Sequence, residues 1–381
     1  MDNPLLNKSD FSHEYFSDAK KLIEKSHKIL VWGDEDADGI TSTSIMLRTF
    51  RKIGKESDYF IPSRNRDGIG LTKKGFKKID SQKYDLLMTV DCGSVNSDEI
   101  SRLLARKKKV IITDHHIPHS KLIEKVPYLN PHLLNVKKFN DLSGAGVSFV
   151  FSMYLLVEFG ICRDYSAALD CDCQMKFLAG LGTRCDRVNN TPLNEFLSEN
   201  VSNIDKCYPQ FHSAGINEYD LCATVSSSKT KIRRNDMVDI FAELKGINEK
   251  EKIRYLKGCY DKVNAYRTKI RQLYKIIKRK ADLMKNEKRI LLIEKEIEHK
   301  YVGVLASMLT EAFNVPVCII GRRNKQFAGE CRANTPYNWV KQLSGLSECF
   351  TSWGGHPQAA GFTLKGDKIE CFIDDFNSYN D

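Results

Sequence analysis

The chain has 381 residues and carries 59 Lys and Arg against 49 Asp and Glu, so its formal net charge is +10 at pH 7. A hydrophobic fraction of 41% with 28% charged residues is ordinary for folded domains and argues against a disordered or fibrous chain. The length allows two domains and a connector, at ~100–200 residues per domain. The basic balance is a mild argument for a polyanionic partner.

The N-terminal sequence MDNPLLNKSDFSHEYF has no basic region followed by an apolar core, and no window reaches ~18 uninterrupted apolar residues. We therefore expect a cytoplasmic protein that uses no membrane, with a nuclear or viral-factory location left open. The 12 cysteines are scattered singly apart from Cys171 and Cys173, and no CxxC pair occurs. This pattern predicts mostly buried, reduced thiols rather than a zinc site.

Strand and helix patterns alternate through the first part of the chain. An amphipathic helix is expected within residues 11–29, before the strand KILVWGD, and a second helix follows Gly39 and ends at Gly54. The strands SDYFIP, YDLLMTV and KKVIIT come next, separated by a Lys-rich helix and a helix over 97–107. This order predicts parallel βαβ units, in which ligands bind outside the carboxyl ends of the strands.

Three carboxylates, Asp34, Asp36 and Asp38, follow the first strand in the run VWGDEDADG. In an extended backbone, residues two apart point the same way, so we expect all three to face one pocket at the end of the strand. Like charges that close repel one another, and a bound divalent cation is the simplest way to hold them ionised. The alternative is an Asp-rich turn that caps the next helix, and the run alone does not separate the two.

Further polar clusters follow other short apolar runs: Asp91 in LLMTVDCGS, then Asp114, His115 and His116 in VIITDHH, and Asp186 in FLAGLGTRCDRV. Carboxylates and imidazoles gathered at strand ends are the ligands expected of a Mn²⁺ or Mg²⁺ pair, rather than of a thiolate-bound zinc ion. The sequence therefore predicts a metal site at this edge of the sheet.

The remaining residues are expected to be mostly helical and then α/β. Two apolar helices are predicted across 147–185, and the polar segment 188–257 is expected to be helical in pieces. In that segment Arg233 and Arg234 could touch a phosphate backbone, although a solvated loop is the simpler interpretation. One long helix is predicted over 261–289, whose basic outer face either contacts phosphates or is simply solvated. The last hundred residues predict a second α/β unit that contains WGGHPQAAGFTL.

These motifs resemble those of the DHH phosphoesterase superfamily, and within it the RecJ-like nucleases. The four family motifs correspond to GDEDADG, VDCGS, TDHH and the segment that ends in Asp186. IPSRNRDGIGL resembles the loop after the second strand, NPH and LSGAGV resemble the connection to the fourth motif, and SWGGHPQAAGF resembles the GGH signature of the DHH-associated domain. The matches occur in order over most of the chain.

The resemblance implies an α/β fold with three parts: an N-terminal parallel-sheet DHH domain (1–190), a helical segment with a long linker helix (191–288) and a smaller C-terminal α/β domain (289–381). It places the active site in the cleft between the domains. It also implies phosphodiester hydrolysis by a two-metal mechanism, with two Mn²⁺ or Mg²⁺ ions as cofactors.

The resemblance assigns a role to each site residue. The metal ligands that it implies are Asp91, which bridges the two ions, Asp36 and Asp38, which bind one ion each, His115 and Asp186, which complete the coordination shells, and Asp34, which supports them or binds weakly. The expected catalytic residues are His116, which stabilises charge or protonates the leaving group, and Asp114, which orients His115. The expected substrate-binding residues are Arg64, Arg66, Arg332, Gly354, Gly355 and His356.

Two departures from the family pattern occur in the first motif. Trp32 stands where the pyrophosphatase and small-nucleotide branches carry a ligand His, which favours the RecJ-like arrangement, and Glu35 stands where RecJ-like sequences often have an aromatic residue or Asn. No oligonucleotide-binding module follows the GGH segment in this sequence, so we expect weaker DNA binding or dependence on a partner.

The main functional expectation is a RecJ-like exonuclease that digests single-stranded nucleic acid, DNA or RNA, from an end. One alternative is a nanoRNase-type phosphoesterase that acts on short oligonucleotides or nucleotide phosphates. The other is a non-catalytic replication-fork scaffold, which is disfavoured because every predicted ligand position holds a competent residue. Replication or repair proteins are left open as partners.

Overall fold

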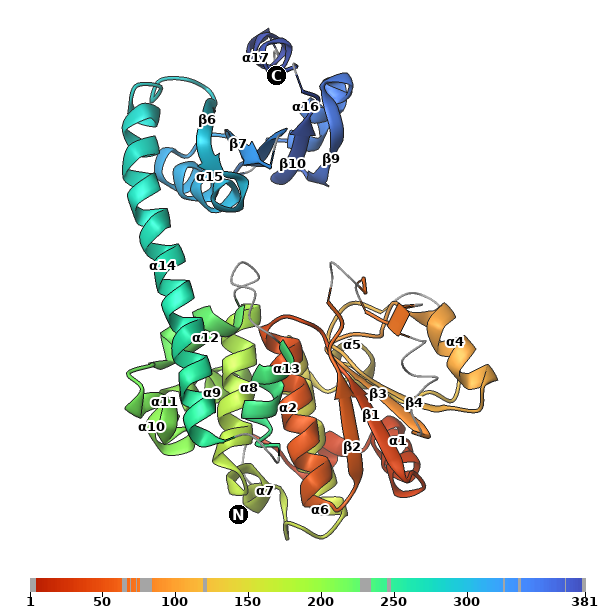
Figure 1. The fold of residues 1–381 in the computed structure, drawn as a ribbon. Coiled ribbons are helices and arrows are strands. Elements are labelled where there is room, and N and C mark those ends of the chain that lie inside the picture. The colour runs from red at the N-terminus through yellow and green to blue at the C-terminus, as the bar shows by residue number, and fades with distance from the viewer. Residues whose placement is uncertain are drawn as a thin grey trace. The chain divides into compact units, whose positions relative to one another are not determined.

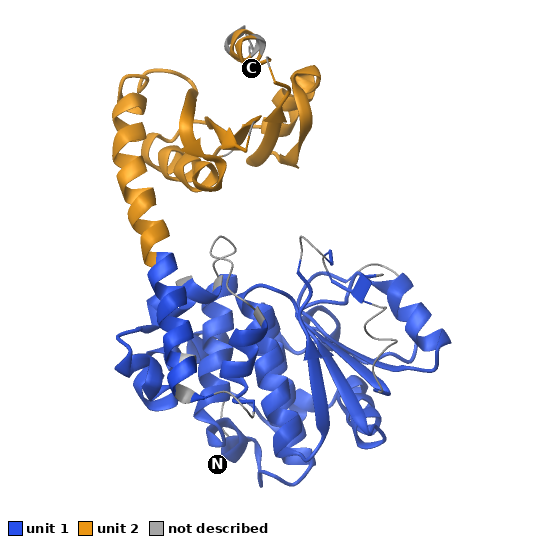
Figure 2. Cartoon of the chain, viewed as in Figure 1, with its two compact units in different colours: residues 1–263 blue, residues 264–381 orange. Residues whose placement is uncertain are grey.

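The computed structural model describes residues 5–63, 67–68, 70–72, 74–75, 84–118, 122–226, 234–244, 248–324, 326–334, 337–366 and 368–378. The chain divides into two compact units, unit 1 (residues 1–263) and unit 2 (residues 264–381), shown in different colours in Figure 2. The finer division into 1–190, 191–288 and 289–381 stays a prediction. The Lys-rich helix expected before residue 80 lies largely outside the described residues.

A five-stranded parallel sheet forms the centre of unit 1, with strand order β2-β1-β3-β4-β5 (Figure 1). The strands are β1 (Lys28–Trp32), β2 (Glu56–Phe60), β3 (Leu86–Val90), β4 (Lys109–Thr113) and β5 (Tyr128–Leu129). The central strands are buried on both faces, which is why they appear in the sequence as continuous apolar runs. The predicted parallel βαβ order is confirmed, whereas β5 is too short for its pattern to reveal it.

Alternate residues of the central strands contribute to two cores on opposite faces of the sheet. Ile29 and Val31 belong to the core that contains α1 (Glu14–Glu24), α2 (Ala37–Lys52), α6 (Gly144–Glu158) and α8 (Cys173–Asp186). Leu30 and Trp32 belong to the other core, with α4 (Ser97–Ala105). In Figure 1, α2, α6 and α8 lie together on one side of the sheet and α4 lies on the other. The ends of the strands are therefore held between two layers of helices, one on each face of the sheet.

The prediction of two helices across 147–185 is wrong, because α6, α7 (Tyr165–Asp170) and α8 are three separate helices. The break before α8 falls at Asp172, whose Oδ1 accepts hydrogen bonds from the backbone N–H of Gln174 and Met175 at 3.0 and 3.1 Å. An N-cap residue has non-helical backbone angles, so a helix cannot continue through it. Asp172 is also buried against Arg48, at 3.0 Å, which anchors the start of α8 to α2.

The segment after α8 is helical in pieces, as predicted, among its described residues. Its helices are α9 (Pro192–Glu199), α10 (Ile204–Cys207), α11 (Pro209–Ser213), α12 (Glu218–Ser226) and α13 (Arg234–Phe241), with a short 3-10 turn at Asn200–Asn203. Other short 3-10 turns lie at Lys8–Phe11, Lys137–Phe139 and Ser347–Cys349. The long helix α14 spans Glu249–Asp282, so the predicted bounds of 261–289 are wrong at both ends. No helix within the described ranges is long and apolar enough to cross a membrane.

Unit 2 contains a mixed sheet with strand order β6-β7-β8-β10-β9. Its strands are β6 (Ile290–Glu298), β7 (Val317–Arg323), β8 (Gln326–Arg332), β9 (Phe350–His356) and β10 (Ala359–Leu364). Helix α15 (His299–Phe313) and the second half of α14 share one core, whereas α16 (Trp339–Gly345) and α17 (Ile369–Ser378) share another. The predicted second α/β unit is confirmed.

Candidate metal centre

The acidic run after β1 leaves the extended conformation earlier than predicted. Asp36 is the N-cap of α2, where its Oδ1 accepts a hydrogen bond from the backbone N–H of Gly39 at 3.0 Å, and Asp38 lies in the first helical turn. The prediction that one extended backbone aims all three carboxylates is therefore wrong. The helix-capping interpretation is correct as local structure, and it is compatible with metal binding because a cap uses one oxygen of a carboxylate.

The predicted ligands gather into two clusters, one of Asp34, Asp36 and Asp91 and the other of Asp38, His115 and Asp186. A third group, Asp91, His115 and His116, shares a residue with each cluster, and in each of the three groups the ligand atoms lie within 4.8 Å of one another. His115 Nε2 is 3.2 Å from Asp91 Oδ1, and it is 3.8 Å and 3.7 Å from oxygens of Asp38 and Asp186. Asp91 therefore lies where the two clusters meet, which is the position expected of a bridging ligand.

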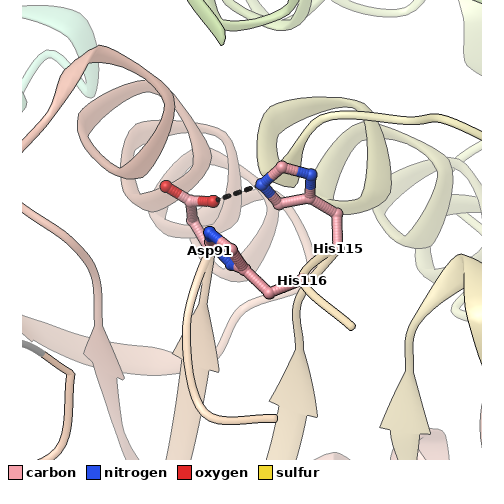
Figure 3. A group of neighbouring side chains, drawn as sticks. All are labelled: Asp91, His115 and His116. Carbon is pink, nitrogen blue, oxygen red and sulfur yellow. Dashed lines mark ion pairs between the residues drawn. The ribbon is translucent and has the colours of Figure 1, made fainter. Parts of the chain in front are cut away.

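The Asp-His-His segment directly follows β4, beside Asp91 at the end of β3 (Figure 3). The carboxylate of Asp114 is buried, and its Oδ1 lies 2.8 Å from His116 Nδ1 and accepts a hydrogen bond from the backbone N–H of His115 at 2.8 Å. Its Oδ2 accepts a hydrogen bond from the backbone N–H of Ser94 at 2.9 Å. Asp114 therefore contacts the backbone of His115 and the ring of His116, and its expected role of orienting His115 stays a prediction.

Backbone groups and glycines also shape the centre, and sequence reasoning assigned none of them. Asp38 accepts hydrogen bonds from the backbone N–H groups of Gly144 at 2.6 Å and Ala145 at 2.9 Å, in the first turn of α6. A Cβ on Gly144 would lie 2.6 Å from the Asp91 side chain, and a Cβ on Gly182 would lie 2.6 Å from Asp38 Oδ1. The glycine-rich runs LSGAGV and GLGT were the available signal, since both place glycine where a carboxylate comes close.

Asn130 is a second residue whose role the sequence did not reveal. Its buried side chain donates hydrogen bonds to the carbonyl oxygen of His116 at 2.9 Å and to Ser94 Oγ at 3.0 Å. Its Oδ1 accepts a hydrogen bond from the backbone N–H of His132 at 2.9 Å and so caps α5 (Pro131–Leu134). Asn130 therefore ties the Asp-His-His segment to α5, which explains why the NPH motif accompanies it.

The centre concentrates negative charge in a buried place. Burial raises the pKa of Asp38 to about 6, and the neighbouring Asp186 and Asp36 act in the same direction. Burial and then the charges of Asp38 and Asp36 raise the pKa of Asp91 well above its ordinary value. Among the described residues, the buried Oδ1 of Asp91 has no hydrogen-bond donor other than its ion-pair neighbour, the His115 ring. Buried carboxylates without donors are costly, and a cation satisfies them, so the donor set fits divalent metal ions.

His116 differs from the other members of the centre because its environment favours the charged form. The hydrogen bond from His116 to Asp114 raises the pKa of His116 to about 9. Burial alone would raise the pKa of Asp114, but the hydrogen bond and the positive charge of His116 outweigh burial and lower it. The pair therefore holds a proton on His116 at neutral pH.

A cavity of about 250 Å³ opens beside His115. Its walls come from the Asp-His-His segment, from helix α5 and from two loops, and they include His115, His132, Asp141, Leu142, Arg187 and Asn189. Two of these residues, Asp141 and Arg187, have left-handed backbone angles, with φ of 59° and 60°. The cavity is thus continuous with the candidate metal centre and lies within unit 1.

The predicted substrate-binding residues of unit 2 lie on two strands of its sheet, β8 and β9, which are separated by β10. Arg332 in β8 pairs with Glu330 at 3.1 Å, and the same carboxylate lies 3.3 Å from His299 Nε2. The residues Gly354, Gly355 and His356 are exposed in the edge strand β9, paired with β10 rather than forming an isolated turn. A Cβ on Gly355 would lie 2.4 Å from the Ala359 carbonyl oxygen, so this position requires glycine. Arg64 and Arg66 lie outside the described residues.

Comparison with known proteins agrees with this geometry. Residues 28–173 match the DHH family, N-terminal domain, and residues 286–380 match the DHHA1 domain. The chain therefore belongs to the DHH family of phosphoesterases and carries a C-terminal DHHA1 domain. Over most of its length it is also a distant homologue of the exonuclease RecJ.

The sequence relatives include the single-stranded-DNA-specific exonuclease RecJ of Bacillus subtilis (strain 168), which is 27% identical over 92% of this chain and 45% of that protein. RecJ of Escherichia coli (strain K12) is 26% identical over 91% of this chain and 65% of that protein. The chain thus spans about half to two thirds of the length of these curated relatives.

The solved structures show the same architecture. A crystal structure of exonuclease RecJ bound to manganese superimposes with a TM-score of 0.73 at 22% identity, covering 100% of this chain and 97% of that one. RecJ from Thermus thermophilus in complex with Mn²⁺ gives a TM-score of 0.67 at 22% identity, covering 99% of this chain and 56% of that one. The fold of the described chain is therefore RecJ-like.

Proposed function

We propose that the chain is a metal-dependent phosphodiesterase that hydrolyses single-stranded nucleic acid from an end, with DNA as the preferred substrate. The observation that carries this proposal is the meeting of the two ligand clusters at Asp91, whose buried oxygen needs a cation. The relatives named as single-stranded-DNA-specific exonucleases support the choice of substrate. Replication or repair proteins as partners and a cytoplasmic location are further parts of this proposal.

The two clusters would hold two Mn²⁺ or Mg²⁺ ions. Asp34, Asp36 and Asp91 would bind one ion, and Asp38, His115 and Asp186, with Asp91 shared, would bind the other. When bound, such ions lower the pKa of water and neutralise the charge that develops on a phosphate.

The chain's own groups would perform the remaining work. His116 is held by Asp114 through Nδ1, which leaves the proton on its Nε2 for the leaving oxygen of the substrate. The raised pKa of His116 keeps that proton available at neutral pH. The first turn of α6 keeps Asp38 in place through two backbone hydrogen bonds. We assign phosphate binding to Arg332, Gly354, Gly355 and His356 of unit 2, and to Arg64 and Arg66.

The deciding experiment is the digestion of end-labelled single strands, as DNA and as RNA, with Mn²⁺ and with a chelator. We expect linear single-stranded DNA to be shortened to mononucleotides or very short products with Mn²⁺, while closed single-stranded circles and blunt duplexes survive. Asp91→Asn should abolish turnover, whereas Asp18→Asn, on the half-exposed Asp18 of α1, serves as the matched control.

Each contrary result has a distinct meaning. Efficient cutting of closed circles at matched Mn²⁺ and salt would indicate that the enzyme is an endonuclease rather than an exonuclease. Activity confined to very short oligonucleotides would instead favour a nanoRNase-type enzyme. Full activity in chelator would contradict the metal mechanism altogether.

A further inference from the structure

We propose that the cavity beside His115 is a nucleotide subsite, in which Arg187, His132 and Asn189 hold the nucleotide next to the scissile bond. The inference rests on the proposed function, because it assigns part of the same substrate to a second place in unit 1. None of these three residues belongs to the predicted ligand or substrate-binding set. The ligand class is a nucleoside monophosphate unit, recognised by its phosphate and by the face of its base or sugar.

The backbone builds this cavity directly onto the metal centre. Helix α8 ends at Asp186, a predicted metal ligand, and Arg187 then takes the left-handed conformation with φ of 60°. This reversal carries Arg187 and Asn189 to the cavity wall immediately after the ligand. A non-glycine residue in that conformation is strained, and such strain is found at sites where the position of the chain matters.

A buried amide holds two segments of the cavity wall together. The side chain of Asn194 is 2% exposed, and its Nδ2 donates hydrogen bonds to the carbonyl oxygens of Asp141 at 2.7 Å and Asn189 at 2.9 Å. The Asn189 side chain also donates to Asp141 Oδ1 at 3.0 Å. The two loops are therefore fixed relative to each other without a ligand, and a preformed pocket loses less entropy on binding.

The chemistry of the walls selects a nucleotide over a cation. Asp141 is the carboxylate on the wall, and the amide of Asn189 already satisfies one of its oxygens. Arg187 brings a permanent positive charge, and within the described ranges no carboxylate forms an ion pair with it. An arginine of this kind favours a phosphate, which accepts paired hydrogen bonds from guanidinium.

The apolar part of the cavity distinguishes a nucleotide from a free phosphate. Pro131 and Leu142 also line the cavity, and both are buried. An inorganic phosphate gains nothing from apolar walls, whereas a base or sugar gains from removing its apolar face from water. Because His115 lines the same cavity, a nucleotide bound there lies next to the reacting phosphate.

Direct binding tests the proposal without relying on turnover. The probe is dAMP, titrated calorimetrically into the full chain in chelator, so that the metal ligands do not contribute a metal-bridged contact. We expect Arg187→Asn to weaken dAMP binding about tenfold, as the loss of a charged hydrogen bond predicts. Asn is chosen because it tolerates the left-handed conformation, and Arg187→Lys should restore part of the affinity through its charge.

Arg163→Ala is the matched control, because that arginine is 86% exposed and far from the cavity in sequence. Unchanged dAMP affinity in Arg187→Asn, or an equal loss in Arg163→Ala, would overturn the proposal. Inorganic phosphate binding as tightly as dAMP would also overturn it, since the apolar wall would then contribute nothing.

Turnover separates this proposal from the proposed function. If the wild-type chain cuts no single strand with Mn²⁺ but Arg187→Asn loses dAMP affinity, the exonuclease assignment fails and the nucleotide subsite stands. If the wild type digests DNA and Arg187→Asn keeps both the dAMP affinity and the KM of the wild type, the subsite proposal is overturned and the exonuclease proposal stands.

Discussion

Asp91 combines a buried charge with a left-handed backbone, with φ of 57°. Asn tolerates this conformation as well as Asp does, so Asp91→Asn removes the charge and leaves the backbone unstrained. We expect the variant to have a higher Tm than the wild type in chelator, because a buried carboxylate near other carboxylates is destabilising. Thermal unfolding with and without Mn²⁺ checks this. If Mn²⁺ raised the Tm of the variant by as much as it raises the Tm of the wild type, the bridging role of Asp91 would be contradicted.

Asp38 predicts how the stability of the metal-free protein depends on pH. Burial raises its pKa from 3.8 to about 6, so between these values the folded state binds more protons at this group than the unfolded state does. The free energy of unfolding should therefore fall as the pH rises from about 4 through about 6. Thermal unfolding in chelator over this range measures the slope, and Asp38→Asn should flatten it. A slope that is identical in the variant would assign the effect to other groups.

His116 gives a pH dependence of the same sign as Asp38, but over a higher range of pH. Its pKa is raised from 6.5 to about 9 by the hydrogen bond to Asp114, so the folded state gains from the proton on His116. This contribution to stability is fully present below pH 6.5 and is lost as the pH rises through about 9. We expect an NMR titration of the metal-free protein to show the raised pKa and Asp114→Asn to move it back toward 6.5. An unmoved pKa in the variant would show that Asp114 does not hold the proton on His116.

At the scale of elements, two helical glycines should respond in opposite ways to the same substitution. Gly→Ala in a helix normally stabilises by up to ~1 kcal/mol. Gly258 of α14 has no neighbouring atom within 4 Å of an added Cβ, so Gly258→Ala should follow that rule. At Gly182 of α8 the added Cβ would lie 2.6 Å from both Asp38 Oδ1 and Thr41 Oγ1, so Gly182→Ala should destabilise the protein and weaken Mn²⁺ binding.

Denaturant unfolding and Mn²⁺ titration of both glycine variants provide the check. Gly258→Ala is the control for the general effect of alanine in a helix. Equal stabilisation by both substitutions, with Mn²⁺ binding unchanged, would mean that α8 and α2 can separate without disturbing Asp38.

The elements themselves could be predicted from sequence where their pattern is local. Continuous apolar runs gave the positions of β1, β3 and β4, and the polar residues after them gave the edge at which Asp91 and His115 lie. The break at Asp172 could not be predicted, because the residue looks like an ordinary helix position until Arg48 is known to be buried against it. The hydrogen bonds from α6 to Asp38 also escaped prediction, since they join residues distant in sequence. Local patterns thus reveal which residues reach the site but not which ones hold them there.

At the scale of the whole molecule, α14 belongs to the core of both units. Leu256 contributes to the main core of unit 1, and Ile277 contributes to a core of unit 2, while the boundary between the units falls at Val263. Asn264→Pro should cost ~3 kcal/mol or more, because proline breaks a helix interior. We expect the unfolding midpoints of both units to fall, and Asn264→Ala is the control that keeps the helix.

Tryptophan fluorescence can follow the two units separately, because Trp32 is buried in unit 1 and Trp339 is buried in unit 2. Variants that keep only one of these residues as a probe would report each transition. A midpoint that falls for one unit alone would show that the helix does not couple their unfolding.

The continuity of α14 also bears on where the chain can be cleaved. Proteases bind their substrates in an extended form, and the connection between two compact units is usually where a chain offers such a form. Here residues on both sides of the boundary have their backbone hydrogen bonds within one helix that runs from Glu249 to Asp282. A protease must first unwind that helix, so the bond between Val263 and Asn264 should be among the last to be cut in the native protein.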